Sequence, residues 1–594
     1  MSQMNLVADY KPELDENNKN MIKKFKDKIQ NGELKIENCK KLTILEFLSE
    51  FKIHKLELTR CQIVTKLNNS NLKELTIRFC QLQNIDNIHL ENLEVLDVSG
   101  NYEIGNCNFE RFKQLKQLDI SYTNRTDISN LKLPQLIMLN LRQNNIKDLK
   151  PISSLVNLEA LDLSGNICID FSPLQQLQQL RILKLSYCNL QSFKTLEPLT
   201  NLVELDVQYN VNNELSSLQY LINLQKLNIL NTNTKNIDIL KSFDVLNLQQ
   251  LDISENEIVN INVLKYLVNL TELFLSDTKV QNIEILLQLE HLQKLDLSRN
   301  PDIDFQPLQQ MVQLQKLSLR SNKLRNISFL NGLINLEFLD LFNNENLDIT
   351  PLQQLVNLTN LNISSCEIID ISSLHTLLNL EVLIISENKI NDIFHIQNLV
   401  KLTDFDIGDN HIKDISILKQ FKCLKKLRLY GNKGIDITPL QYITQLIFLE
   451  ASDCDLYEIS ALRPLVNLEY LALTKNNIFN FYPIRVLDAE VNVGGNLIVE
   501  SSDFFTFFDV QDESEFINEE PTNQQIVLAG KMKIVDTTTS SIRDINTTRK
   551  NYLIGKQIVE DTLISLKEKQ HKILLSLFNK AVQLFKLLEH EECQ

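Results

Sequence analysis

A short phrase of residues returns along this chain at an almost constant interval. It reads leucine, two residues, leucine, one residue, an aliphatic residue, two residues and asparagine, as in LQQLDISEN at Leu248–Asn256. Aligned on its last position, the Asn slot, it occurs 22 times between Cys39 and Asn496, and nearly all copies are 22 residues apart. A period of this length predicts a solenoid, in which each repeat forms one rung and packs against its neighbours. Such an architecture directs the search for function to an exposed surface rather than to a pocket.

Each repeat predicts a strand followed by a return segment. In LDISENEIVNINVLKYL, Leu251 and Ile253 alternate with Asp252 and Ser254, which places the first two side chains inside and the other two outside. After Asn256 the chain turns, and further apolar residues approach the interior from the opposite side. We therefore predict an α/β solenoid of about 22 repeats, with a parallel sheet on its concave face and short helical or extended turns on its convex face.

Cysteines are unusually frequent in the Asn slot, where six of the ten in the chain stand: Cys39, Cys61, Cys80, Cys188, Cys366 and Cys454. The slot faces inward and needs a compact donor for the turning backbone, a role that Asn fills best and Cys or Thr can approximate. The alternative is a metal or disulfide ladder along the first three, since successive rungs lie about 4.8 Å apart. No CxxC pair and no histidine cluster accompanies them, which favours core thiols in a reducing compartment.

The extended phrase LxxLxLxxNxIxDIxxLxxL resembles the leucine-rich repeat class of the type-1 protein phosphatase regulatory subunit, and it is similar to the repeats of the bacterial internalins. The resemblance covers about Leu34 to Ile498, and in character the chain is closest to the long repeat arrays of unicellular eukaryotes. It implies a leucine-rich repeat fold whose concave face binds other proteins. The carboxy-terminal cap of the phosphatase subunit has no recognisable copy here.

The outward positions of the predicted strands carry mostly Asp and Ser. An acidic groove lined by hydroxyls could receive a basic partner or a cation, but charged faces are usually only solvated, which favours a filler role. Apolar or aromatic side chains replace the expected Asp or Ser at eight positions: Leu230, Phe274, Phe338, Phe342, Val382, Ile384, Tyr430 and Phe448. Interfaces concentrate binding energy in a few such anchors, so we predict that these residues form the partner-binding surface.

Four of these eight residues predict a single patch, because they lie only two rungs, or about 10 Å, apart: Phe338, Phe342, Val382 and Ile384. Arg320 and Arg428 flank the predicted patch. The alternative is that drifting surface positions acquire an occasional phenylalanine without function.

The two ends of the chain differ from the repeats. Asp15–Gly32 predicts an amphipathic helix that caps the first rung. Residues 501–530 contain no Lys or Arg and predict an acidic linker with a phenylalanine-rich cap. Residues from about Thr547 to Glu591 predict a helix or helical pair that folds onto the solenoid, self-associates as a coiled coil or binds another protein. The predicted parts are therefore the tail and cap (1–32), the solenoid (33–500), the linker and cap (501–530) and the helical tail (531–594).

Motifs of catalytic sites are missing from the sequence, which has no phosphate-binding glycine loop, no HExxH and no GxSxG. We expect no catalytic residue, no cofactor and no metal. The net charge of −16 disfavours nucleic acid and membrane as partners, and neither a signal peptide nor a membrane span is recognisable, so we expect a cytoplasmic protein. The predicted function is a non-enzymatic scaffold that binds a protein partner. The resemblance leaves two alternatives open, a regulatory subunit of a type-1 phosphatase and a secreted or surface adhesin of internalin type.

Overall fold

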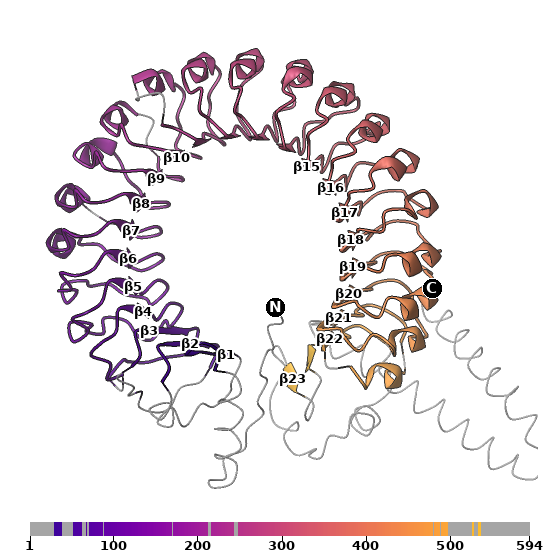
Figure 1. Cartoon of the computed structure of the whole chain (residues 1–594), viewed down its shortest axis with the longest axis horizontal. Coiled ribbons are helices and arrows are strands. Elements are labelled where there is room, and N and C mark those ends of the chain that lie inside the picture. The colour runs from indigo at the N-terminus through magenta and orange to yellow at the C-terminus, as the bar shows by residue number, and fades with distance from the viewer. Residues whose placement is uncertain are drawn as a thin grey trace, which may run out of the picture. The chain divides into compact units, whose positions relative to one another are not determined.

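The computed structural model confirms a solenoid of stacked rungs. It describes residues 29–37, 52–61, 67, 71–86, 88–168, 170–211, 215–242, 247–478, 480–487, 489–496, 525–527 and 533–535. These residues belong to two compact units, Met1–Leu358 and Thr359–Gln594, called here the first and the second unit. The strands β1 to β22 correspond one by one to the 22 copies of the repeated phrase (Figure 1).

Fifteen parallel strands form the sheet of the first unit, each paired with its neighbours in sequence order up to β15. The register sets equivalent leucines side by side, as Leu273 lies beside Leu295. Their bounds are β1 Glu33–Glu37, β2 Lys55–Thr59, β3 Glu74–Arg78, β4 Val95–Asp97, β5 Gln117–Asp119, β6 Met138–Asn140, β7 Ala160–Asp162, β8 Ile182–Lys184, β9 Glu204–Asp206, β10 Lys226–Asn228, β11 Gln250–Asp252, β12 Glu272–Phe274, β13 Lys294–Asp296, β14 Lys316–Ser318 and β15 Phe338–Asp340.

The second unit continues the same pattern and then extends it. Strands β16 to β22 pair in parallel in sequence order. Beyond the last repeat, β24 pairs in parallel with β22, and β23 pairs with β24 in the antiparallel sense. The bounds are β16 Asn360–Asn362, β17 Val382–Ile384, β18 Asp404–Asp406, β19 Lys426–Arg428, β20 Phe448–Glu450, β21 Tyr470–Ala472, β22 Glu490–Asn492, β23 Gln525–Val527 and β24 Lys533–Val535.

Short 3-10 helices form most of the return segments, on the side of each unit opposite to the strands (Figure 1). In the first unit they are η2 Lys150–Ser154, η3 Ser172–Gln176, η4 Phe193–Leu196, η5 Ser216–Tyr220, η6 Asp238–Ser242, η7 Asn262–Tyr266, η8 Glu284–Gln288, η9 Gln306–Gln310, η10 Ser328–Gly332 and η11 Thr350–Gln354. In the second unit they are η12 Ser372–Thr376, η13 Phe394–Ile396, η14 Ser416–Gln420, η15 Thr438–Tyr442, η16 Ser460–Leu462 and η17 Tyr482–Ile484.

The DIxxL part of the phrase explains why these helices start where they do. In η11 the carboxylate of Asp348 accepts a hydrogen bond of 3.0 Å from the backbone N–H of Thr350, and hydrogen bonds from Thr350 lower the pKa of Asp348. Leu352, inside the helix, is fully buried. An acceptor at the start and one apolar anchor are enough to hold a single turn against the core.

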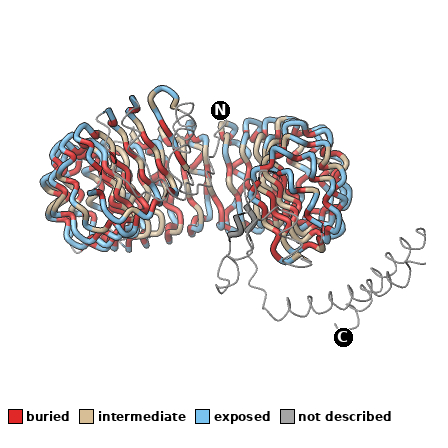
Figure 2. Tube along the Cα trace, turned by 90° about the horizontal axis from the view of Figure 1, so that it is seen from below, coloured by how far each residue is buried: buried red, intermediate tan, exposed pale blue. Residues whose placement is uncertain are grey.

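The core lies between strands and helices, and buried and exposed residues alternate along the trace of each rung (Figure 2). The Asn slot faces this core as predicted. Asn344 is fully buried, and its amide nitrogen donates to the carbonyls of Leu319 and Leu341 at 3.0 and 2.7 Å. Its amide oxygen accepts from the backbone N–H groups of Asn322 and Leu324 at 3.1 and 3.0 Å. One side chain therefore joins two neighbouring turns.

Cysteines in the slot reproduce the donating half of this pattern. The Cys188 thiol donates to the carbonyl of Leu163 at 3.2 Å and to that of Ser186 at 3.5 Å, and burial raises its pKa to about 12. Every cysteine among the described residues is a free thiol. The core-thiol interpretation is supported, although Cys39 lies outside the described residues.

A second ladder of asparagines, which the sequence analysis did not predict, follows the helices. The amide nitrogen of Asn335 donates to the carbonyl of Val312 at 2.9 Å, and that of Asn357 donates to Ile334 at 2.9 Å. Each bond reaches the preceding rung from the exposed side, so this ladder supplements the buried one.

The predicted helical ends remain predictions for the most part. Within Asp15–Gly32, only residues 29–32 are described, and Asn31 and Gly32 form a turn rather than a helix. The helix predicted from about Thr547 to Glu591 lies wholly outside the described residues. Strand β23 falls in the predicted linker 501–530, and β24 falls at the start of the predicted tail 531–594. The described part of the chain contains no α-helix.

Candidate partner-binding face

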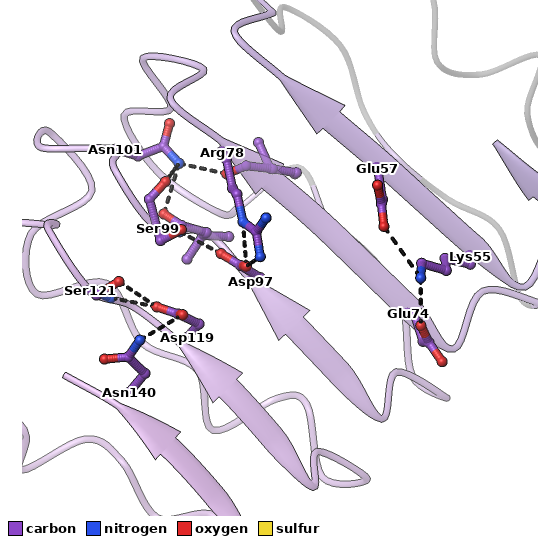
Figure 3. A network of polar contacts seen from close by, with 12 residues as sticks. Lys55, Glu57, Glu74, Arg78, Asp97, Ser99, Asn101, Asp119, Ser121 and Asn140 are labelled. Atoms are coloured by element: carbon purple, nitrogen blue, oxygen red, sulfur yellow. Dashed lines mark hydrogen bonds and ion pairs between the residues drawn. The ribbon is translucent and has the colours of Figure 1, made fainter. Parts of the chain in front are cut away.

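The outward side chains of the strands line the inner face of each unit. The outward position between the two inward strand residues, called here the Asp column, has a structural role, which Figure 3 illustrates for β4 and β5. A carboxylate oxygen of Asp97 accepts the backbone N–H of Ser99 at 3.0 Å, and Asp119 accepts that of Ser121 at 2.9 Å. Asn140 does the same for Arg142. Each Asp or Asn thus satisfies the backbone just after its strand, which supports the filler interpretation of this column.

Burial affects the charge of the same column. Removal from water raises the pKa of Asp119, Asp206 and Asp252, and it raises the pKa of Asp406 to about 6. Buried carboxylates are costlier to ionise than exposed ones, so these four acids keep their protons to a higher pH than a free Asp does.

The eight predicted partner-binding residues all lie on the strand side, and none is fully exposed. Each is half-buried between its neighbours. Four belong to the first unit and four to the second: Leu230, Phe274, Phe338 and Phe342, then Val382, Ile384, Tyr430 and Phe448. Within the predicted patch, Phe338 and Phe342 fall in one unit and Val382 and Ile384 in the other, so its continuity stays a prediction.

In the first unit, two of the predicted aromatic residues are covered by a cation. The ammonium of Lys294 lies 4.7 Å from the ring centre of Phe274 and 3.2 Å from a carboxylate oxygen of Glu272. Lys294 was not among the predicted residues; the strand register pairs it with Glu272, and it reaches Phe274 diagonally. The cation holds the aromatic ring in place and shields part of it from water.

The second aromatic residue of the first unit that a cation covers is Phe342. The guanidinium of Arg320 lies 4.8 Å from its ring centre, and one nitrogen is 3.5 Å from a carboxylate oxygen of Asp340. Arg320 was predicted to flank the patch; it lies directly over one of its members. Part of the Phe342 ring is therefore covered by the guanidinium.

In the second unit, a cation and a second aromatic ring both contact Phe448. Arg428 lies 5.0 Å from the ring centre of Phe448, and its guanidinium donates to Asp404 at 2.8 Å. Tyr470 stacks on the other side of Phe448, with ring centres 4.7 Å apart and planes 11° apart. Sequence reasoning missed Tyr470, but a signal was present, since Phe448 and Tyr470 hold the same position in consecutive repeats.

Tyr430 is placed differently. Its ring lies over Gly408, where any Cβ would collide with it, and its hydroxyl forms a hydrogen bond with the side chain of Ser386. The ring thus crosses one whole rung. The glycine permits this close approach because it has no Cβ, whereas Ser is the commonest residue at this position in the other repeats.

Two further classes of site find no support in the described part of the chain. No group of three or more His, Cys, Asp and Glu side chains in it could hold a metal ion. No helix in it is long and apolar enough to cross a membrane.

Comparison with known proteins agrees with the geometry. The family model described as Leucine Rich repeats (2 copies) matches residues 134–176 and 312–354. No curated protein matches the chain.

Among solved structures, one of a TLR13–ssRNA13 complex is 21% identical, covers 81% of this chain and 90% of its own, and has a TM-score of 0.51. A leucine-rich repeat protein of Leptospira interrogans is 24% identical over 59% of this chain and 95% of its own, with a TM-score of 0.48. Internalin C2 of Listeria monocytogenes is 31% identical over 35% of this chain and 83% of its own, with a TM-score of 0.28. The repeated phrase, the stacked parallel strands and the matched family model together identify the chain as a leucine-rich repeat protein.

Proposed function

We propose that this protein is a non-enzymatic scaffold that binds a protein partner through the inner face of its strands. Leucine-rich repeat arrays generally serve as binding scaffolds, because stacked repeats create long continuous surfaces. The observation that carries the proposal is the set of aromatic–cation–carboxylate groups on this face, at Phe274, Phe342 and Phe448.

These groups suit an interface for a physical reason. The rungs need no aromatic side chain at these outward positions, where most repeats carry a polar residue. Aromatic residues and arginines are the side chains in which interfaces concentrate binding energy. Rings held in place by a cation or by stacking lose little conformational freedom when a partner binds.

We further propose that the protein works in the cytoplasm. Thiols of the Asn slot, such as Cys188 and Cys454, donate hydrogen bonds to backbone carbonyls. Only the reduced thiol can donate in this way, so a reducing compartment preserves the fold as described.

Affinity capture with the full chain tests the proposed function. The variant combines Phe448→Ala with Tyr470→Ala on the inner face, and the matched control combines Phe394→Ala with Tyr442→Ala, which are exposed and lie on or at the end of outer helices of the same unit. If the pair is a hot spot of about 2 kcal/mol, partner affinity falls by about thirtyfold in the inner variant only. Equal capture by both variants, with unfolding curves unchanged, contradicts the proposal.

The capture, together with localisation of the chain in cells, separates the alternative functions. Recovery of a type-1 phosphatase catalytic subunit supports a regulatory-subunit role, whereas detection of the chain on the cell surface supports an adhesin. Nuclease treatment tests for RNA as a partner, since the similar TLR13 structure is a complex with ssRNA13. We expect nuclease to leave capture unchanged, because the net charge of −16 opposes a polyanion.

A further inference from the structure

Tyr430 presents an aromatic ring among carboxylates in the second unit. Its ring crosses Gly408, and the carboxylates of Asp406, Asp409 and Glu387 are close enough to raise the pKa of its phenol, in addition to the effect of burial. These three acids come from two neighbouring rungs, Glu387 from that of β17 and the other two from that of β18, and stacking brings them to the ring from the rung of β19.

The carboxylates around Tyr430 are not neutralised by neighbouring cations. In the described part of the chain, Glu387, Asp406 and Asp409 form no ion pair with Lys, Arg or His. Glu387 accepts a hydrogen bond of 2.6 Å from the hydroxyl of Ser365, and Asp406 accepts the backbone N–H of Gly408 at 3.0 Å. Both partners are uncharged, so the negative charge remains available.

Arg428, two residues before Tyr430 on the same rung, is engaged elsewhere. It donates to Asp404 at 2.8 Å and lies over Phe448. The positive charge of Arg428 lowers the pKa of Asp406 through space. The negative charges of Glu450 and Asp404 raise the same pKa. The region around Tyr430 therefore has a surplus of negative charge beside an aromatic face.

We propose that Tyr430 and its surrounding carboxylates Glu387, Asp406 and Asp409 bind a lysine or arginine side chain of a partner protein. The proposal rests on the proposed function, whose binding face it specifies. A cation is attracted to the face of an aromatic ring and gains further from adjacent carboxylates. A metal ion fits less well, because no group of acidic, Cys or His side chains in the described residues has the spacing to hold one.

The pKa values of the carboxylates predict how binding at this site depends on pH. Burial and the neighbouring Glu387 and Asp453 raise the pKa of Asp409, and burial raises that of Asp406 to about 6. A bound cation favours the ionised form of both acids. Affinity for a cation is therefore expected to fall as the pH is lowered through about 6.

The chain contains no tryptophan, so Tyr430→Trp places a single fluorescent indole at the site. The probe is the blocked tripeptide Gly-Arg-Gly, compared with Gly-citrulline-Gly, which has a similar shape without the charge. Tyr442→Trp, at the exposed end of η15 in the same unit, supplies the matched control. We expect a saturable change in fluorescence at position 430 with about tenfold preference for arginine.

Two further variants test the two halves of the site in the reporter background. Glu387→Gln combined with Asp409→Asn removes charge and is expected to weaken arginine binding about threefold to tenfold. Gly408→Ser leaves every charge in place but displaces the aromatic ring, so it also weakens binding. Neither change should alter the response of the control at position 442.

The proposal is overturned if the indole at position 430 does not respond to arginine, responds equally to citrulline, or responds no more than position 442 does. It is equally overturned if binding strengthens below pH 6. If partner capture still depends on Phe448 and Tyr470 in any of these cases, the proposed function stands and only the cation site falls. If capture is independent of the inner face, the proposed function itself falls.

Discussion

Replacing the asparagine of a single rung tests the energetic role of the Asn slot. Asn344→Ala removes an amide that makes four hydrogen bonds of 2.7 to 3.1 Å, two to carbonyls and two from backbone N–H groups. Asn344 is fully buried, so water cannot readily replace these bonds. At about 1 kcal/mol for each net bond, the change should lower the free energy of unfolding of the first unit by about 3–5 kcal/mol.

The natural cysteines of the slot supply a graded comparison. A thiol keeps the bonds to the carbonyls, as Cys188 does, but accepts only weakly from the next turn. Asn344→Cys is therefore expected to cost about half as much as Asn344→Ala. Glu345→Ala, at the exposed neighbouring residue, serves as the control and should change stability by less than about 0.5 kcal/mol.

Urea unfolding gives the size of the effect, and amide hydrogen exchange gives its location. The N–H groups of Asn322 and Leu324 lose their acceptor in Asn344→Ala, so their exchange should accelerate most. Because an array of repeats can unfold locally, the exchange data show whether the lost stability resides in these rungs. A cost below about 1 kcal/mol, or unchanged protection of both amides, would refute the reasoning.

Three further predictions concern the second ladder, the buried carboxylate and the thiols. Asn357→Ala loses one exposed bond of 2.9 Å to Ile334 and should cost only about 0.5–1 kcal/mol in urea unfolding, far less than Asn344→Ala. Asp406 has a folded-state pKa of about 6, above the ordinary 3.8, so the folded protein binds the extra proton and unfolding free energy should fall as the pH rises from about 4 to about 7. Asp406→Asn keeps the acceptor for Gly408 and should remove this dependence, raising stability by about 1–3 kcal/mol at pH 8 and hardly at all at pH 4; an unchanged pH profile contradicts it. Among the described cysteines, iodoacetamide should label the exposed Cys423 first and the partly buried Cys107 next, with the buried Cys188 and Cys454 labelled only on unfolding, as peptide mass spectrometry can check.

The candidate site was only partly predictable. Strand alternation correctly placed Phe274, Phe342 and Phe448 on the inner face, because side-chain direction in a strand follows a period of two. It did not predict that Lys294, Arg320 and Arg428 would cover these rings. Which long side chain lies over which ring depends on rotamers and on competing carboxylates in adjacent rungs, and neither is encoded in a local pattern.

The sequence by itself determined the number of rungs, the parallel sheet and the inward Asn slot, since each follows from a phrase repeated at a fixed spacing. The same regularity misleads where one repeat departs from it. Arg125 stands where the next repeat has Ile146, yet it is fully buried, and its guanidinium donates to the carbonyls of Gly105 and Cys107 at 3.2 and 3.0 Å.

The buried Arg125, the second asparagine ladder and the acids around Tyr430 could be identified only from the tertiary structure. Each depends on atoms from different rungs, brought close by stacking. A repeat specifies its own turn through local hydrogen bonds and alternation, but contacts between repeats depend on which side chains happen to share a column.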